Sequence, residues 1–267
     1  MQRSKQPRAP IAAAFARARA EERVALIPYV MAGYPDLAMC EALAFRLDQA
    51  GADIVELGVP FSDPLADGAT IQAASQRALE QGVTLEDTLV LASRLSERMR
   101  APPVLMTYYN PIYSFGVAHF CEAASAAGVA GVIVPDLPPE EAEYLQETAA
   151  PYGLELIFLV APTTTPQRIG LIAAKAGGFI YYVALKGVTG AMHLRTDGIA
   201  EQIARIRSHT DLPIMIGFGI KDGTSARMVA PLADGVVLGT SLVTTMERAQ
   251  EVDSLLDREL DNRAHEP

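Results

Sequence analysis

Three carboxylates within residues 56–68 are the side chains of this sequence best suited to chemistry. A β-type run, 52–55, leads directly into Glu56, and the following loop contains Asp63 and Asp67 with two prolines and two glycines. A strand ending in Glu56 and a loop returning Asp67 would bring two carboxyl groups to one pocket. Carboxyl groups in unlike surroundings can divide acid and base work at neutral pH. Taken alone, such a segment would more often be a surface loop with solvated acids.

The elements that must position these residues follow a regular alternation along the chain. Short apolar or β-branched runs closed by Gly, Pro or Asp predict strands at 25–30, 53–56, 104–107, 131–134, 154–160, 179–183, 213–217 and 235–238. Amphipathic stretches predict helices at 37–49, 85–98, 117–127, 139–152, 166–176, 198–208, 224–231 and 243–260. An N-terminal extra helix is expected at 11–20, and an additional helix at 70–81, after the second strand.

This alternation predicts an α/β fold, a single-domain (β/α)8 TIM barrel, in preference to an open doubly wound sheet. The strands are apolar throughout, which indicates a parallel sheet buried on both faces. A length of 267 residues suits such a barrel. We expect a flexible N-terminal tail over 1–10, the barrel over 11–262 and a C-terminal tail over 263–267. A transit peptide is the alternative for the basic first twenty residues.

The barrel topology predicts at which end of the molecule the active site lies. In TIM barrels the active site lies at the C-terminal ends of the strands, and phosphate binds at the loops after strands seven and eight. Glu56 is expected as the last residue of strand two, while Gly217 and Gly219 lie at the end of strand seven and Gly239 and Thr240 at the end of strand eight. Glycines let backbone amides approach an anion, and a helix N-terminus adds positive charge. The two loops together predict a phosphate site, although tight turning alone would explain either loop singly.

Composition excludes several classes of function. The 22 basic and 32 acidic residues give a formal net charge of −10, which disfavours a nucleic-acid groove. No apolar run approaches the roughly 20 residues needed to span a bilayer. Cys40 and Cys121 form no recognisable pair, and the four histidines show no ligand spacing, so neither a disulfide scaffold nor a metal site is expected. A cytoplasmic location suits this composition.

Five motifs carry a resemblance to a known family. They are IPYV with GYPD at 27–36, the run 56–72, VPDLP at 134–138, GVTG at 187–190 and GFGI at 217–220. Together they resemble the tryptophan synthase α subunit, from about residue 12 to about residue 255. The resemblance implies a lyase of tryptophan biosynthesis that performs retro-aldol cleavage of indole-3-glycerol phosphate to indole and glyceraldehyde 3-phosphate. It also implies that this chain binds no cofactor or metal.

The resemblance implies a distinct role for each carboxyl group. Glu56, at the mouth of an apolar barrel, should have a pKa raised by desolvation, which suits donating and recovering a proton. Asp67, on a more solvated loop, should stay ionised and accept a hydrogen bond from the indole N–H. The expected phosphate-binding residues are Gly190, Gly217, Gly219, Gly239 and Thr240. The expected indole pocket is Tyr29, Ile133, Leu159, Tyr181 and Phe218, for which ordinary barrel packing is the alternative.

A mobile lid is expected after strand six, where glycines at both ends of the GVTG motif could act as hinges. The resemblance implies that its Thr189 closes against Asp67. The chain departs from the family pattern at Leu185 and Lys186, where an arginine before the lid is missing, and at Ala69, where many members have proline. These departures should weaken loop closure without altering the carboxylates.

The resemblance also implies a partner β subunit that carries pyridoxal phosphate, in an α2β2 heterotetramer. Asp63, Pro64 and Asn110 match family positions that face this partner. Three alternatives remain: a free-standing lyase that releases indole, a weakly catalytic activator of the β subunit, and a barrel isomerase acting on a related sugar phosphate. Strong activity without a partner would identify the first. Both carboxylates argue against the second, and the full 56–68 run argues against the third.

Overall fold

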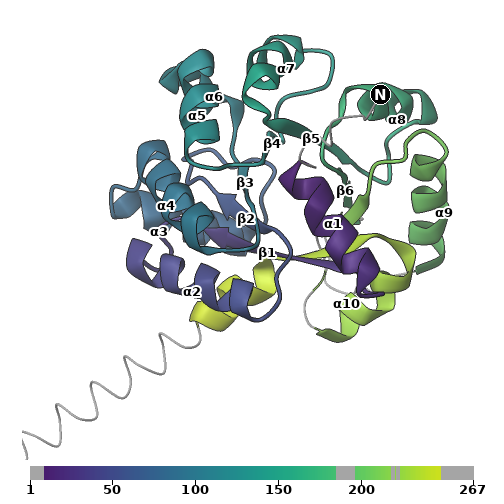
Figure 1. The fold of residues 1–267 in the computed structure, drawn as a ribbon, viewed down its shortest axis with the longest axis horizontal. Helices are drawn as coiled ribbons and strands as arrows, with labels where there is room; N and C mark the ends of the chain where they lie inside the picture. The colour runs from purple at the N-terminus through teal and green to yellow at the C-terminus, as the bar shows by residue number, and fades with distance from the viewer. Residues whose placement is uncertain (1–8, 185–195, 218–219, 221–222, 248–267) are drawn as a thin grey trace, which may run out of the picture.

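The computed structural model describes residues 9–184, 196–217, 220 and 223–247. Its strands are β1 (Ala25–Met31), β2 (Val55–Gly58), β3 (Pro103–Met106), β4 (Gly131–Ile133), β5 (Glu155–Val160), β6 (Ile180–Val183), β7 (Ile214–Gly217) and β8 (Gly235–Leu238). Each pairs in parallel with the next, and β8 pairs with β1, which closes the barrel (Figure 1). The predicted (β/α)8 barrel is confirmed.

Helices surround the barrel and connect its successive strands (Figure 1). They are α1 (Pro10–Ala20), α2 (Leu37–Gln49), α3 (Ala69–Glu80), α4 (Leu85–Arg98), α5 (Tyr109–Phe115), α6 (Val117–Ala126), α7 (Glu143–Ala149), α8 (Pro166–Lys175), α9 (Thr196–Arg207) and α10 (Gly223–Val229), with short 3-10 turns η1 (Ala150–Tyr152) and η2 (Ala230–Leu232). Residues 240–247 are also helical. Helices α1 and α3 are the two extra helices that were predicted. Helix α5 was not predicted.

Helix starts with a local capping signal match their predicted positions. The Asp36 side chain accepts a hydrogen bond from Met39 N at the start of α2, and Thr84 forms a capping box with Asp87 at the start of α4. Side-chain caps satisfy backbone N–H groups that have no partner inside the helix. Helix α7 has no side-chain cap, and it begins at Glu143 instead of the predicted residue 139. The prediction was therefore wrong where the local signal was weak.

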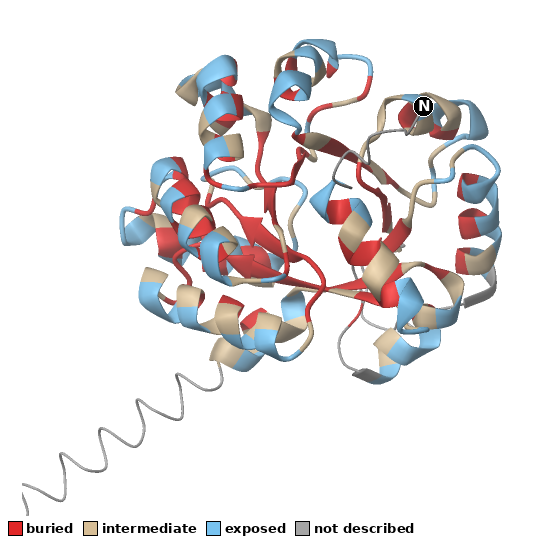
Figure 2. Cartoon of the chain, in the orientation of Figure 1, coloured by how far each residue is buried: buried red, intermediate tan, exposed pale blue. Residues whose placement is uncertain are grey.

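Strand side chains are buried on both faces of the barrel wall, as the apolar runs predicted. Figure 2 shows the strands largely in the colour of buried residues and the outer helix surfaces in that of exposed ones. On β2, Leu57 packs in the layer between wall and helices, whereas Ile54, just before the strand, packs in the barrel interior. Among the described residues, no helix is long and apolar enough to cross a membrane.

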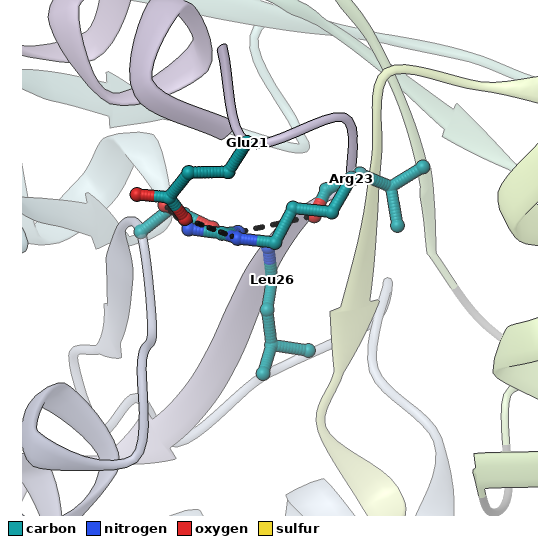
Figure 3. Close-up of polar contacts among 5 residues, drawn as sticks. Glu21, Arg23 and Leu26 are labelled. Carbon is teal, nitrogen blue, oxygen red and sulfur yellow. Dashed lines mark hydrogen bonds and ion pairs between the residues drawn. The ribbon is translucent and has the colours of Figure 1, made fainter. Parts of the chain in front are cut away.

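The N-terminal end of the barrel is closed by packing and by paired charges. Helix α1 contributes Ile11 and Phe15 to the interior cluster, and Phe15 meets Phe179 edge to face at 5.9 Å. Asp53, just before β2, accepts hydrogen bonds from both terminal nitrogens of Arg23 and from Leu26 N at 2.9 Å. Arg23 also donates to Glu21 (Figure 3). This end of a TIM barrel contributes to stability and not to catalysis.

Strand β2 differs from its prediction in a way that matters for the site. It extends to Gly58, so Glu56 is its second residue and not its last. Leu57 and Gly58 pair with β1 and with β3 on the two sides. Gly58 looks like a strand terminator in the sequence, but a Cβ there would lie 2.6 Å from Tyr29 Cζ. Glycine is therefore needed inside the strand because an aromatic ring approaches it closely.

The terminal boundaries remain predictions. Helix α1 begins at Pro10, the last residue of the expected N-terminal tail. Residues 1–8 and 248–267, which include the expected C-terminal tail and most of the predicted last helix, lie outside the described residues.

Candidate active site

A cavity opens at the C-terminal ends of the strands, where the barrel topology placed the site. Its lining residues are Tyr29, Glu56, Asp67, Ile71, Met106, Tyr181, Ile220, Val237, Gly239 and Thr240. Glu56 and Asp67 therefore share one pocket, although they come from a strand and from the loop beyond it. The apolar members Ile71, Met106, Ile220 and Val237 were not predicted as site residues. The inward-facing positions of strands β3 and β8 could have identified Met106 and Val237.

Glu56 is a buried carboxyl group with unsatisfied oxygens. Its side chain is 1% exposed, and neither Oε1 nor Oε2 has a hydrogen-bond partner among the described residues. Burial, assisted by the charge of Asp67, raises the pKa of Glu56 to about 8. Because low polarity disfavours the charged form, the group is mainly protonated at neutral pH. The direction of this shift is the one expected from the sequence.

Asp67 has a different environment. The Tyr108 hydroxyl donates a hydrogen bond to Asp67 Oδ2 at 3.0 Å. Burial raises the pKa of Asp67 to about 6, and the Tyr108 hydrogen bond opposes that rise. Asp67 is therefore mainly ionised at pH 7, as expected, although it is partly buried and its pKa is higher than a solvated loop would give. The two carboxyl groups of one pocket thus differ in protonation at neutral pH.

Tyr108 holds the Asp67 loop from the end of β3. Its hydroxyl accepts a hydrogen bond from Ala66 N at 2.9 Å while donating to Asp67, and its ring stacks on Phe61 at 5.2 Å. Ser75 on α3 fixes the other end of the loop, because its hydroxyl accepts from Phe61 N and donates to Phe61 O. The sequence reasoning missed Tyr108. Its place two residues after a barrel strand was the available signal.

One of the predicted phosphate-binding glycines is required by the packing of a neighbouring ring, and another lines the cavity. A Cβ at Gly217, the last residue of β7, would lie 2.6 Å from Tyr181 Cζ, so close packing alone requires glycine there. Gly239 and Thr240 line the cavity, and Thr240 begins the helix 240–247. A helix N-terminus that faces a cavity favours an anion. The strand-eight loop is therefore the better supported part of the predicted phosphate site.

Four other predicted site residues, and two positions that depart from the family pattern, lie outside the described residues. They are Leu185, Lys186, Thr189, Gly190, Phe218 and Gly219.

The predicted indole pocket is only partly brought together around the cavity. Tyr29 and Tyr181 line it and are 5% and 4% exposed. Ile133 and Leu159 belong to or pack on the interior cluster but do not line this cavity. Leu159 is the cross-strand neighbour of Tyr181. Their contact with an indole ring stays a prediction.

Of the predicted partner-facing residues, Asp63 and Pro64 lie on the Asp67 loop, whereas Asn110, expected in a loop, lies in the first turn of α5. Asp63 and Asn110 are exposed, and Pro64 is partly exposed. Leu65, next to them, is 92% exposed, which is unusual for a large apolar side chain. Among the described residues, no group of three or more His, Cys, Asp or Glu side chains is placed to hold a metal ion.

The fold and the site define the class of protein: a TIM-barrel protein with two carboxyl groups of different pKa in one cavity at the C-terminal ends of its strands. The family model described as "Tryptophan synthase alpha chain" matches residues 15–266. The alpha chain of Roseiflexus castenholzii is 50% identical over 240 residues, which cover 90% of this chain and 92% of that protein. The alpha chain of Chloroflexus aurantiacus is 47% identical over 244 residues, 91% and 92% of the two chains. The chain therefore belongs to the tryptophan synthase alpha chain family.

Solved structures agree with this assignment. Tryptophan synthase subunit alpha from Legionella pneumophila superposes with a TM-score of 0.85 at 36% identity and covers 92% of both chains. A chain of the aminoacrylate-bound tryptophan synthase from M. tuberculosis gives 0.82 at 36% identity, with 90% and 93% covered. The resemblance seen in the sequence motifs is confirmed, and the chain is a lyase of tryptophan biosynthesis. The family needs no cofactor of its own, since pyridoxal phosphate belongs to the β subunit.

Proposed function

We propose that this chain cleaves indole-3-glycerol phosphate to indole and glyceraldehyde 3-phosphate and passes the indole to a β subunit. The observation that carries the proposal is Glu56, a buried carboxyl without a hydrogen-bond partner among the described residues, in the same pocket as Asp67. A buried polar group without a partner costs free energy, so it is retained where chemistry requires it.

The two protonation states fit the steps of a retro-aldol cleavage. Protonated Glu56 donates to the indole carbon that bears the glycerol chain, and ionised Asp67 accepts a hydrogen bond from the ring N–H and stabilises the positive charge. The carbon–carbon bond then breaks and its electron pair returns to the ring. The hydroxyl on the departing carbon loses its proton to the Glu56 carboxylate and becomes the aldehyde. Glu56 ends protonated again, so protons balance over the cycle.

The substrate extends from the strand-eight loop to the Asp67 loop. We assign its phosphate to the N-terminus of the helix 240–247, supported by the cavity position of Gly239 and Thr240. Gly190, Gly217 and Gly219 complete the proposed phosphate site. The indole ring lies against Tyr29 and Tyr181, with Ile133, Leu159 and Phe218 as further proposed contacts. Thr189 closes over Asp67 once the substrate is bound.

The proposed partner is a β subunit in an α2β2 heterotetramer, in the cytoplasm. Its docking surface includes Asp63, Pro64 and Asn110. Gln72 on α3 donates hydrogen bonds to Pro64 O at 3.2 Å and to Asp67 O at 3.0 Å. Contact with the outer side of the loop would therefore act directly on the position of Asp67.

Steady-state cleavage of indole-3-glycerol phosphate across a β-subunit titration tests this function. We expect low activity alone and at least about tenfold activation in the complex, which requires only about 1.4 kcal/mol of coupling. A flat titration despite complex formation, with strong activity alone, would identify a free-standing lyase. Stimulation of the β subunit without any cleavage would identify a regulatory activator.

A further inference from the structure

Tyr29 bridges the two chemical parts of the proposed site. Strand β1 lies between β8, which leads into Gly239, and β2, which carries Glu56. Tyr29 is the cross-strand neighbour of Glu56. A Cβ at Gly239 would lie 3.4 Å from Tyr29 Cβ, while the ring of Tyr29 extends over Gly58. One side chain therefore spans from the proposed phosphate position to the strand of the buried carboxyl group.

Among the described residues, the hydroxyl of Tyr29 donates its hydrogen bond to a weak acceptor. Tyr29 lines the cavity, and its hydroxyl lies against Gly58 and donates a hydrogen bond to Met31 Sδ at 4.0 Å. A thioether sulfur is a weak acceptor. A phenylalanine would fill the same volume without placing a polar group there. Burial, followed by the charges of Asp67 and Glu56, raises the pKa of Tyr29 well above its ordinary value, so the hydroxyl keeps its proton to donate.

The order of the strands decides which part of the substrate passes Tyr29. Indole-3-glycerol phosphate carries two hydroxyl groups between its ring and its phosphate. With the phosphate beside β8 and the reacting ring carbon beside Glu56 on β2, the hydroxylated linker must cross β1. We propose that the Tyr29 hydroxyl donates a hydrogen bond to a glycerol hydroxyl oxygen of the substrate, so that Tyr29 selects a hydroxylated linker and positions it against Glu56. This inference rests on the proposed function.

Binding to two ligands separates this role from simple ring packing. The first ligand is indole-3-glycerol phosphate, and the second is the analogue in which both glycerol hydroxyls are replaced by hydrogen. Calorimetry in a Glu56→Gln background avoids turnover of the substrate. We expect Tyr29→Phe to weaken binding of the substrate about tenfold and of the analogue less than about twofold.

Tyr182→Phe is the matched control. Tyr182 is 2% exposed and belongs to the cluster between the barrel wall and the helices, away from the cavity. The substitution removes a buried phenol hydroxyl from the same fold, and it should leave both Kd values within about twofold of the parent. If Tyr29→Phe weakened binding of the two ligands equally, Tyr29 would contribute only apolar packing and the inference would be overturned. No weakening of either ligand would also overturn the inference.

A pH profile distinguishes a Tyr29 hydroxyl that binds the substrate from one that changes the pKa of Glu56. In the chain with Glu56 intact, Tyr29→Phe should lower kcat/KM and leave the alkaline limb of its pH profile within about 0.3 unit. A larger movement of that limb without selectivity between the two ligands would make Tyr29 a partner of Glu56 and overturn the proposal. A parent chain that neither binds nor cleaves the substrate would overturn the proposed function and this inference together. If the parent chain cleaves the substrate and Tyr29→Phe changes neither its Kd nor its kcat/KM, the inference alone is overturned.

Discussion

Asp53 lies two residues before β2 and Glu56 is the second residue of that strand, yet the surroundings of these two carboxyl groups are opposite. Both are buried, at 0% and 1% exposure. Asp53 accepts hydrogen bonds from Arg23 and from Leu26 N, whereas Glu56 has no partner among the described residues. Both carboxyl groups lose their hydration, so the difference between them comes from the partners that the fold supplies.

The two ends of the barrel therefore treat a buried carboxyl group differently. At the N-terminal end, a guanidinium and a backbone amide compensate the buried charge of Asp53. At the C-terminal end, burial and the charge of Asp67 raise the pKa of Glu56 to about 8, and no cation among the described residues opposes that rise. A TIM barrel tolerates an unpaired carboxyl at this end because the rest of the wall is closely packed and hydrogen-bonded.

The largest expected effect is the loss of cleavage in Glu56→Gln. The amide keeps the volume but cannot transfer a proton, so kcat should fall by at least about 10²-fold. Binding of glycerol phosphate, measured by calorimetry, should stay within about threefold of the parent. Asp53→Asn provides the comparison, since its folded fraction should keep the parental kcat. Cleavage by Glu56→Gln at more than about a tenth of the parental rate would remove Glu56 from the mechanism.

Asp53→Asn should act on stability instead. Removing the charge takes from Arg23 its buried counterion and leaves it the exposed Glu21, which should cost about 2 kcal/mol of the free energy of unfolding. Urea denaturation at pH 7 measures the loss. Asp63→Asn, at an exposed loop position, is the control and should change the value by less than about 0.5 kcal/mol. A loss below about 1 kcal/mol for Asp53→Asn would show that the N-terminal pair is not needed to hold the fold.

The stability of the ligand-free chain should also depend on pH through Glu56. Its pKa is raised in the folded state, so the native chain binds more protons than the unfolded chain between pH 4.5 and about 8. The contribution of this group to stability is therefore lost as the pH rises through that window. Glu56→Gln, which does not titrate, should be more stable than the parent by up to about 5 kcal/mol at pH 9 and equal to it near pH 4. The same difference at both pH values would contradict this reading.

The smallest predicted effect concerns Tyr108. The proposed mechanism uses ionised Asp67 and protonated Glu56, so kcat/KM should be bell-shaped with limbs near pH 6 and pH 8. The Tyr108 hydrogen bond lowers the Asp67 pKa, and Tyr108→Phe should therefore move the acidic limb upward by about half a unit. The alkaline limb should stay in place. A stationary acidic limb would show that Tyr108 fixes the loop only through Phe61 and Ala66.

Much of the architecture followed from local patterns. The bounds of α2 and α4 were predicted because Asp36 and Thr84 cap them with side chains only three residues from the N–H groups they satisfy. The barrel followed from the alternation of apolar runs and amphipathic stretches. Helix α5 was missed because no side-chain cap marks its start and it has only seven residues.

By itself, the sequence determined the family, the barrel and the presence of Glu56 and Asp67 at one end of it, since these depend on order and spacing along the chain. Only the tertiary structure decided how each carboxyl group behaves. Asp53 meets Arg23 across 30 residues and Asp67 meets Tyr108 across 41, whereas the oxygens of Glu56 face the cavity without a partner among the described residues. Gly58 and Gly217 are required by the rings of Tyr29 and Tyr181 on neighbouring strands. A pKa or a close approach depends on which distant groups share a buried space, and chain order alone does not specify that.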